Sequence, residues 1–203
     1  DVVLIEPSIY EDERGYFFES YRENLFEKET GKINFVQENE SKSAYGTLRG
    51  LHYQLPPFAQ SKLVRVTDGI VLDVAVDIRK SSPFFGKYVT QVLSAENKKQ
   101  LFIPKGFAHG FLTLSEEAIF QYKVDNYYSK ESEAGIIWND KNIGIDWGIP
   151  VEDIILSEKD KGMRDFESRI ADHGSRITDR ELRITDHESL ITDCESRIAE
   201  VNR

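Results

Sequence analysis

The sequence predicts an all-β domain, a sandwich or barrel of short strands, from three observations. Short runs rich in β-branched and aromatic residues fill positions 1–125, and turn signals such as Leu55-Pro56-Pro57 separate them. Residues 69–78 alternate with period 2, because Asp73 and Asp77 share one face while aliphatic side chains fill the other. Helical signal before the C-terminal tail is thin. Many short strands at this spacing are typical of a sandwich or a barrel.

The expected elements follow in order along the chain. Strands are expected at residues 1–5, 62–66, 69–78, 88–94, 100–103, 110–115 and 118–124, each rich in β-branched or aromatic side chains. A helix is expected at 22–30, where Gly31 supplies the stop, and a helical turn is expected near Ser157. Periodicity alone leaves open which kind of β-sandwich or barrel these strands build.

The chain divides into one domain, residues 1–166, and a tail, residues 167–203. Its 203 residues suffice to bury a substantial core, and all 12 Phe and 9 Tyr precede the tail. Isoleucine recurs every seventh residue in the tail, yet each heptad offers essentially one apolar residue where a coiled coil needs two, with Asp where the second should be. A solvated, partly disordered appendage is favoured over a marginal helix, and an oligomerisation helix comes third. His173 and His187 recur with the repeat and are interpreted as repeat members rather than ligands.

Charge and cysteine content restrict the partners and the compartment. A formal net charge of −10 disfavours nucleic acid and anionic membranes, so an anionic ligand must be met by local arginines and lysines. The sole cysteine, Cys194, excludes an intrachain disulfide and favours a reducing, cytoplasmic location. No membrane-length apolar run and no secretory signal are visible. The chain starts at Asp1 rather than Met, so we expect a shortened N-terminus.

The most informative segment is Leu48-Arg49-Gly50-Leu51-His52-Tyr53-Gln54. It places His52, a near-neutral base, close to Arg49, a fixed positive charge that can hold an anion. For a lone histidine, a core residue bonded to a backbone carbonyl is the alternative interpretation. Other motifs in the chain decide between the two.

These motifs are Asp12-Glu13-Arg14-Gly15-Tyr16-Phe17, Gly46-Thr47-Leu48-Arg49-Gly50-Leu51-His52-Tyr53-Gln54, Gln60-Ser61-Lys62-Leu63-Val64, Ile103-Pro104-Lys105-Gly106-Phe107-Ala108-His109-Gly110-Phe111 and Trp138-Asn139-Asp140. Together they closely resemble the dTDP-4-dehydrorhamnose 3,5-epimerase family over about residues 1–165. The resemblance implies a cupin-type jelly roll. It also implies a homodimer in which the N-terminal segment crosses to the neighbouring subunit. The tail lies outside the resemblance.

The resemblance also implies the catalytic residues. Epimerisation next to a ketone needs a base for the C–H proton, an electrophile for the enolate oxygen, and an acid on the opposite face. The matching positions are His52 as base, Asp160 in Leu156-Ser157-Glu158-Lys159-Asp160 as its orienting partner, Tyr122 as acid, Lys62 at the enolate oxygen, and Asp73 supporting that end of the pocket.

Each assignment has a plainer alternative. Tyr122 alternates with Phe120 and Val124, so on pattern alone it is a core residue. Asp160 on pattern alone is a polar residue near a helix start. Lys62 alternates with two valines, and an inward lysine is unusual unless it has an anionic partner, which favours a functional role.

Positive groups are needed for the diphosphate of a sugar nucleotide. Arg14 and Arg49, with Lys159 as a third, match the family's anion-contacting positions, and the planar guanidinium fork suits phosphate. Arg14 taken alone is a surface turn arginine. The positions expected to fix the sugar, the nucleobase or the loops around them are Glu19, Gln37, Asn39, His109 and Glu133, and Phe17 or Phe18 is expected to stack on thymine.

A metal centre is the rival chemistry for this kind of fold. Many jelly rolls hold a transition metal through a His-x-His motif, a Glu and a later His. Position 54 is Gln where the second histidine would stand, which leaves too few ligands for a firm site. We therefore expect no metal and no other cofactor.

The sequence thus predicts a cofactor-free isomerase that acts on dTDP-4-dehydro-6-deoxyglucose in dTDP-rhamnose biosynthesis. A relative that inverts only C3 or only C5 of a similar 4-keto sugar is the close alternative, because one base and one acid serve both carbons. A non-catalytic sugar-nucleotide-binding jelly roll is the alternative from another class. The joint presence of His52, Lys62, Tyr122 and Asp160 argues against it, because a binder needs no acid and base on opposed faces.

Overall fold

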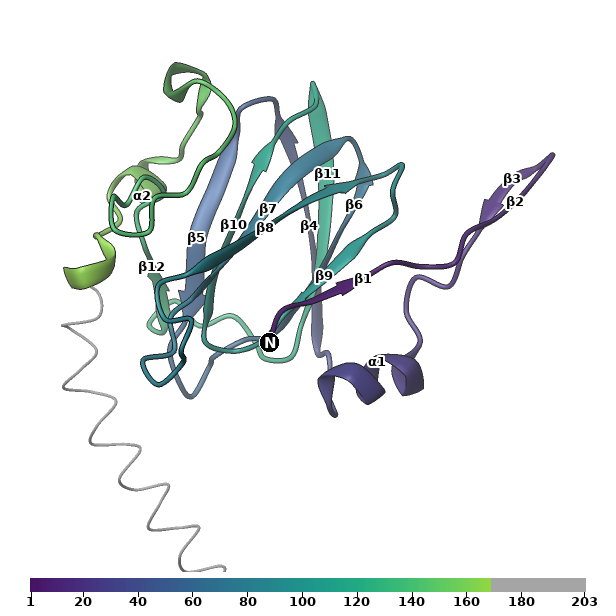
Figure 1. The fold of residues 1–203 in the computed structure, drawn as a ribbon, viewed down its shortest axis with the longest axis horizontal. Helices are drawn as coiled ribbons and strands as arrows, with labels where there is room; N and C mark the ends of the chain where they lie inside the picture. The colour runs from purple at the N-terminus through teal and green to yellow at the C-terminus, as the bar shows by residue number, and fades with distance from the viewer. Residues whose placement is uncertain (169–203) are drawn as a thin grey trace, which may run out of the picture. The chain divides into compact units, whose positions relative to one another are not determined.

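The computed structural model describes residues 1–168, which fold mainly as β-strands (Figure 1). The strands are β1 (Val3–Ile5), β2 (Tyr10–Asp12), β3 (Gly15–Phe17), β4 (Gln37–Ala44), β5 (Leu48–Gln54), β6 (Lys62–Asp68), β7 (Ile70–Asp77), β8 (Tyr88–Ser94), β9 (Gln100–Ile103), β10 (Phe107–Thr113), β11 (Glu117–Val124) and β12 (Glu133–Gly135). The helical elements are α1 (Glu23–Thr30), the 3-10 turn η1 (Val151–Asp153) and α2 (Glu158–Lys161). The all-β class predicted from the sequence is confirmed.

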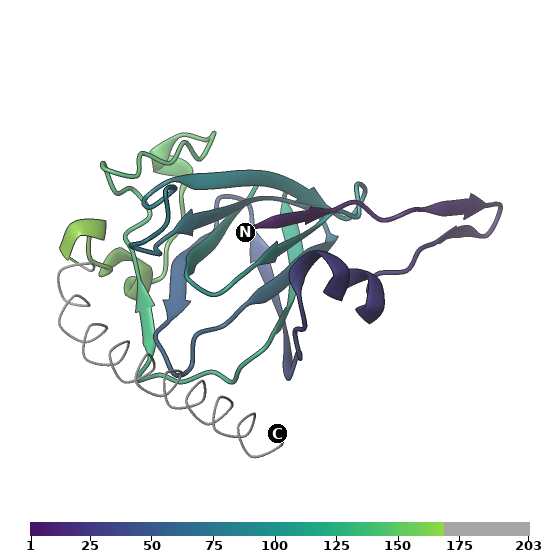
Figure 2. The ribbon, with the colours of Figure 1, turned by 60° about the horizontal axis from the view of Figure 1, so that its bottom comes forward.

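Two antiparallel five-stranded sheets make up most of the described residues. One sheet has the order β1-β9-β6-β11-β4 and the other has the order β12-β5-β10-β7-β8. The sheets enclose a shared interior (Figure 2), where Phe111 of β10 stacks on Phe120 of β11 with ring centroids 4.1 Å apart. Aliphatic side chains from both sheets complete this core. Side chains from the two opposed sheets therefore form one common interior.

Several boundaries agree with the sequence. β8 and β9 occupy the expected 88–94 and 100–103, and α1 ends where Gly31 adopts φ +77° and donates its N–H to the carbonyl of Glu27. Ser157 begins α2 by accepting a hydrogen bond from the backbone N–H of Asp160. The strand expected at 69–78 is β7, but both of its faces are buried over most of its length, and Val71 and Ala75 on the face of the two buried aspartates belong to the core.

The sequence pattern does not predict β2, β3, β4, β5 or β12. The longest omission, β4, reads Gln-Glu-Asn-Glu-Ser-Lys-Ser-Ala and lacks the apolar alternation by which strands are recognised. Its alternate residues 38, 40, 42 and 44 are exposed, whereas 37, 39, 41 and 43 are more buried. Both faces of β4 are polar because one faces solvent and the other lies toward the polar residues of the site described below.

Among residues 1–168, no helix is long and apolar enough to cross a membrane. The interpretation of the heptad tail falls on residues outside those that the structure describes, so the preferred solvated appendage stays a prediction.

Candidate active site

A histidine–aspartate pair joins β5 to α2. His52 Nε2 lies 2.6 Å from Asp160 Oδ1, and the hydroxyl of Ser157 donates to the other carboxylate oxygen at 2.9 Å. Burial of Asp160 acts to raise its pKa, but the bonds from His52 and Ser157 outweigh burial and leave the pKa below the usual value. Asp160 is therefore ionised near neutral pH. As acceptor of the Nε2 proton, it leaves Nδ1 of His52 as the basic nitrogen.

Glycines let β5 approach β10 closely beside this histidine. A Cβ added to Gly50, whose φ is +138°, would lie 2.5 Å from the Cα of Gly110. Any larger residue would push the two strands apart. The glycine in the Arg-Gly-Leu-His motif thus fits a backbone contact two residues from the candidate base.

The candidate base and acid come from opposite sheets. His52 of β5 stands directly opposite His109 of β10, so both side chains share one face of their sheet. His109 stacks on Phe120 of β11 with ring centroids 6.1 Å apart, which places that face toward the other sheet. Tyr122 lies two residues after Phe120 on the same side of β11. The interior therefore lies between His52 on one wall and Tyr122 on the other.

A chain of polar contacts leads from a buried carboxylate to Lys62. Asp73 is fully buried on β7 and bonds His109 Nε2 at 2.9 Å. Lys62 Nζ lies 3.5 Å from His109 Nδ1 and 3.4 Å from the backbone carbonyl of His52. Burial lowers the pKa of His109, so its ring is neutral and Nδ1 accepts from the ammonium. Lys62 thus points inward and contacts neutral groups directly, and the negative charge of Asp73 reaches it through His109.

The charge of Lys62 should control the alkaline limb of the rate. Burial lowers the pKa of Lys62 to about 8, although Asp73 and Glu133 act to raise it. The ammonium is present below this pH and is lost as the pH rises through it, so kcat/KM should fall above pH 8. The other groups facing Lys62 are His109, which is neutral, His52 and Tyr122, whose pKa burial raises.

Asp73→Asn checks this assignment, because it removes a charge that raises the Lys62 pKa. The alkaline limb of the variant should move to lower pH. The assignment of the alkaline limb to Lys62 would be contradicted if the fall in kcat/KM occurred at the same pH in Asp73→Asn as in the wild type. It would also be contradicted if the fall began only at the pH where tyrosines ionise.

Glu133 links the histidine–aspartate pair to the rim of the site. It stands opposite Gln54 where β12 pairs with β5, and one of its carboxylate oxygens forms an ion pair with Lys159. The other accepts from the hydroxyl of Tyr128 at 3.1 Å. Burial acts to raise the Glu133 pKa, but the Lys159 ammonium outweighs it and the pKa is lowered. Tyr128 was not predicted, because nothing in Tyr127-Tyr128 distinguishes a rim residue from any exposed tyrosine.

The inward face of β4 carries further predicted residues. Asn39 stands directly beside Tyr122 where β4 pairs with β11, and it accepts a bond from Gln37 at 2.8 Å. Arg49 of β5 reaches back to β4 and donates to the hydroxyl of Ser43 at 2.9 Å. These polar groups border the acid side of the interior.

Two predicted residues lie apart from this constellation within the single chain. Arg14 is at the turn of the β2–β3 hairpin, 85% exposed and bonded to Asp12, and in both views the hairpin lies away from the two sheets (Figures 1 and 2). Glu19 pairs with Arg22 at 3.5 Å just before α1. One copy of the chain therefore does not bring Arg14 and Glu19 to His52.

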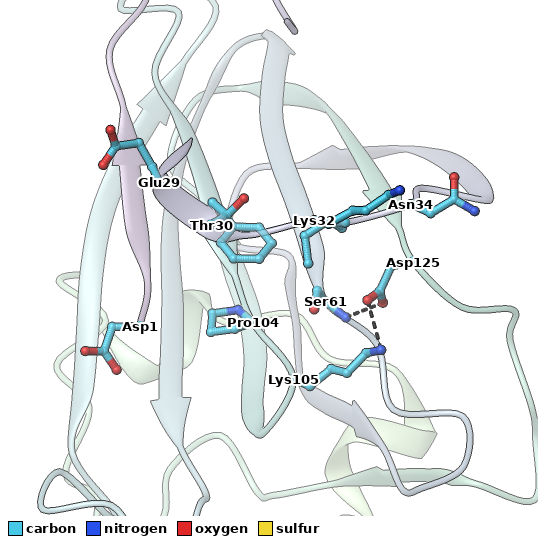
Figure 3. Close-up of a pocket in the computed structure, with 11 residues that line it drawn as sticks. Asp1, Glu29, Thr30, Lys32, Asn34, Ser61, Pro104, Lys105 and Asp125 are labelled. Carbon is cyan, nitrogen blue, oxygen red and sulfur yellow. Dashed lines mark hydrogen bonds and ion pairs between the residues drawn. The ribbon is translucent and has the colours of Figure 1, made fainter. Parts of the chain in front are cut away.

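The structure also has two cavities away from the histidine–aspartate pair. One, of about 520 Å³, lies near the end of α1, where Lys105 pairs with Asp125 below Lys32 and Asn34 (Figure 3). The other, of about 710 Å³, lies between the N-terminal segment and α1. Neither is lined by His52, Lys62 or Tyr122, so we do not place the chemistry in them.

Within residues 1–168, no group of three or more His, Cys, Asp or Glu side chains is arranged to hold a metal ion. The two histidines are paired with Asp160 and Asp73, and the carboxamide of Gln54 bonds backbone groups. The donor set fits proton transfer by side chains better than metal coordination.

An all-β interior that holds a paired histidine, an inward lysine and an opposed tyrosine fits an acid–base isomerase. Comparison with known proteins makes the class specific. The family model for dTDP-4-dehydrorhamnose 3,5-epimerase matches residues 1–168. The chain belongs to the dTDP-4-dehydrorhamnose 3,5-epimerase family.

Individual relatives agree. The dTDP-4-dehydrorhamnose 3,5-epimerase of Shigella flexneri is 60% identical over 161 residues, which cover 79% of this chain and 88% of that protein. The crystal structure of the same enzyme from Elizabethkingia anophelis NUHP1 aligns with TM-score 0.80 and 55% identity, over 83% of this chain and 92% of that one. A dTDP-6-deoxy-D-glucose-3,5-epimerase from Legionella pneumophila, solved with dTDP-4-keto-L-rhamnose, aligns with TM-score 0.78 and 48% identity, over 83% and 91%. The predicted cupin-type jelly roll is confirmed.

Proposed function

We propose that the protein is a dTDP-4-dehydrorhamnose 3,5-epimerase that converts dTDP-4-dehydro-6-deoxyglucose to dTDP-4-dehydrorhamnose, in dTDP-rhamnose biosynthesis. The observation that carries the proposal is the His52–Asp160 pair on one wall of the interior, opposite Tyr122 on the other. The sole cysteine further supports a reducing, cytoplasmic setting.

The proposed mechanism moves one proton at each face. His52 Nδ1 takes the proton from the carbon next to the C4 ketone, and the C–H electron pair forms a C–C double bond as the carbonyl oxygen becomes an enolate. The Lys62 ammonium stabilises that oxygen, and Asp160 stabilises the imidazolium. The Tyr122 hydroxyl then protonates the carbon from the other face. Solvent reprotonates the tyrosine and removes the proton from His52, so no external oxidant or reductant is needed.

Anion binding is proposed for arginines and a lysine around the interior. Arg49 lies on β5, three residues before His52, and Lys159 lies next to Asp160, so both can meet a diphosphate whose sugar reaches the base. Gln37 and Asn39 border the acid side of the interior. Arg14 and Glu19 require another explanation, because their own chain holds them elsewhere.

We propose that a second copy of the chain supplies that explanation, with the β2–β3 hairpin of each subunit reaching the site of the other. The hairpin carries Tyr10, Tyr16 and Phe17, each more than half exposed, and such an apolar surface favours a protein partner. In this proposed homodimer, Arg14 of one subunit contacts the diphosphate bound in the other subunit's site. Phe17 of the same hairpin stacks on the thymine of that nucleotide.

Mixing two inactive variants tests this exchange. Arg14→Ala and His52→Asn homodimers should each be impaired, whereas subunit exchange creates a site with an intact His52 and Arg14 of the partner subunit. Activity should rise after mixing and incubation. Mixtures that form heterodimers yet stay as inactive as their parents would contradict the crossed hairpin.

Deleting residues 167–203 should leave turnover and the melting temperature nearly unchanged. The tail contains no aromatic residue and has a thin apolar stripe, so it offers little area to pack against the domain. Thermal unfolding, turnover and the oligomeric state of the truncated chain check this expectation. Loss of the dimer or of much thermal stability would assign the tail a structural role.

The proposed function is tested by incubating the protein with dTDP-4-dehydro-6-deoxyglucose in D2O and following C3 and C5 by NMR. Deuterium at both carbons, with inversion at both, supports the 3,5-epimerase. Deuterium at one carbon indicates the single-position relative, and none at either carbon indicates a binder. The same reaction in EDTA should proceed unchanged.

A further inference from the structure

The carboxamide of Gln54 bonds three backbone groups in two loops. Its Nε2 donates to the carbonyl of Phe58 at 2.7 Å and to the carbonyl of Tyr127 at 3.1 Å, and its Oε1 accepts from the N–H of Ser129 at 2.7 Å. The residue is 8% exposed. Both donors and the acceptor of the amide are therefore used, and few other side chains offer this combination at one point.

The two loops join the strands that carry the proposed site. The loop 55–61 leads from β5, which carries His52, to β6, which begins with Lys62. The loop 125–132 leads from β11, which carries Tyr122, to β12, which begins with Glu133. The side chain of Gln54 therefore bonds two loops. One loop joins the strand of the proposed base to the strand of Lys62, and the other joins the strand of the proposed acid to the strand of Glu133.

Gln54 also fixes the backbone on both sides of Tyr128. It bonds residue 127 and residue 129, and the Tyr128 hydroxyl donates to Glu133, which pairs with Lys159 next to Asp160. Five further bonds join the same loops, from Gln60 to Asn126, from Asn126 to Pro57, two between Ser61 and Asp125, and one from Leu55 to Ser132, but all of these residues belong to the loops themselves. Gln54 differs because it stands on β5, two residues from His52.

We propose that Gln54 is a positioning residue for the epimerisation: its carboxamide holds the two loops in register with β5, so that the base side and the acid side of the interior keep a fixed separation. Gln54 itself takes and gives no proton. This inference rests on the proposed function for its kinetic consequences.

The test compares Gln54→Met with Gln121→Met. Methionine keeps the length and volume of glutamine but makes none of the three bonds. Gln121 is the matched control, because it also takes part in three side-chain bonds, to Arg65 and Glu40, and lies on the opposite side of β11 from Tyr122. Gln54→Glu is the second variant, since it keeps the acceptor for Ser129 and loses both donors.

In Gln54→Met, measured well below its melting temperature, kcat should fall by about ten- to a hundredfold, the scale of a small misalignment of catalytic groups. Substrate recovered from D2O should carry deuterium, because proton removal and return are no longer coordinated. Amide hydrogen exchange in residues 125–132 should accelerate. Gln54→Glu should show the same changes, and Gln121→Met should show none of them.

A Gln54→Met protein with a lowered melting temperature but wild-type kcat, KM and unlabelled recovered substrate would overturn the proposal, because Gln54 would then serve stability alone. Failure of both Gln54 variants to fold would overturn it in the same way. A wild-type protein that does not epimerise the sugar would instead refute the proposed function, and the hydrogen exchange of residues 125–132 would still decide whether Gln54 holds the loops.

Discussion

Replacing His52 with asparagine should lower kcat by on the order of a thousandfold or more, the scale of a general base acting with its orienting partner. Asparagine retains an amide that can donate to Asp160, so the packing around α2 should survive. Binding of dTDP should be nearly unchanged, because in the proposed mechanism Arg49 and the other cationic groups hold the diphosphate, whereas His52 acts on a C–H bond. Turnover assays and calorimetric titration with dTDP separate the two effects.

Asp160→Asn provides the comparison. It removes the carboxylate that orients the imidazole but leaves the base in place, so its loss of kcat should be smaller than that of His52→Asn. A His52→Asn enzyme that kept most of its rate would show that another residue removes the proton. Loss of dTDP affinity equal to the loss of kcat would place His52 in binding.

Replacing Tyr122 with phenylalanine removes a single hydroxyl and should slow inversion while His52 continues to exchange the substrate's hydrogen. Burial raises the pKa of Tyr122, so the phenol is protonated at neutral pH and can act as an acid. In D2O the variant should therefore label recovered substrate faster than it forms product. NMR of the recovered sugar and of the product measures both rates in one experiment.

Tyr21→Phe is the control for loss of a tyrosine hydroxyl, because Tyr21 packs against Phe26 and Phe35 in an aromatic cluster separate from the site. It should exchange and invert like the wild type. Equal slowing of exchange and inversion in Tyr122→Phe would move Tyr122 to enolate stabilisation or binding. Unchanged inversion would reject it as the acid.

The sequence pattern predicted most of the strands that form the core, and it singled out Lys62 as an unusual inward lysine. The period-2 alternation of residues 69–78 placed two aspartates on one face, and the structure buries both with hydrogen-bond partners, His109 for Asp73 and Arg79 for Asp77. Lys62 stood out because an inward lysine costs solvation free energy, and the anionic neighbourhood that it needs is present.

The pattern failed where a strand serves the site rather than the core. The pattern does not predict β4, because its inward side chains are polar and three of its four outward side chains are charged, so no hydrophobic period exists to detect. Tyr128 and the bonds of Gln54 were missed because they depend on loops that are distant in sequence and adjacent only after folding. The resemblance places Arg14 at the site, but within one chain it lies at the turn of the β2–β3 hairpin and bonds Asp12, so its role at the site depends on the proposed second copy.

Two different groups are proposed to handle the proton on opposite faces of the sugar, and a single-turnover reaction of the wild-type protein in D2O tests this most directly. Enzyme in excess over dTDP-4-dehydro-6-deoxyglucose is quenched early, and the deuterium content of each inverted carbon is measured in product and in recovered substrate. If two groups act, the product should carry solvent deuterium at each inverted carbon from the first turnover. The recovered substrate should still carry its original hydrogen at those carbons. Product that retains the substrate's own hydrogen would show one group carrying the proton across both faces, and would contradict the account.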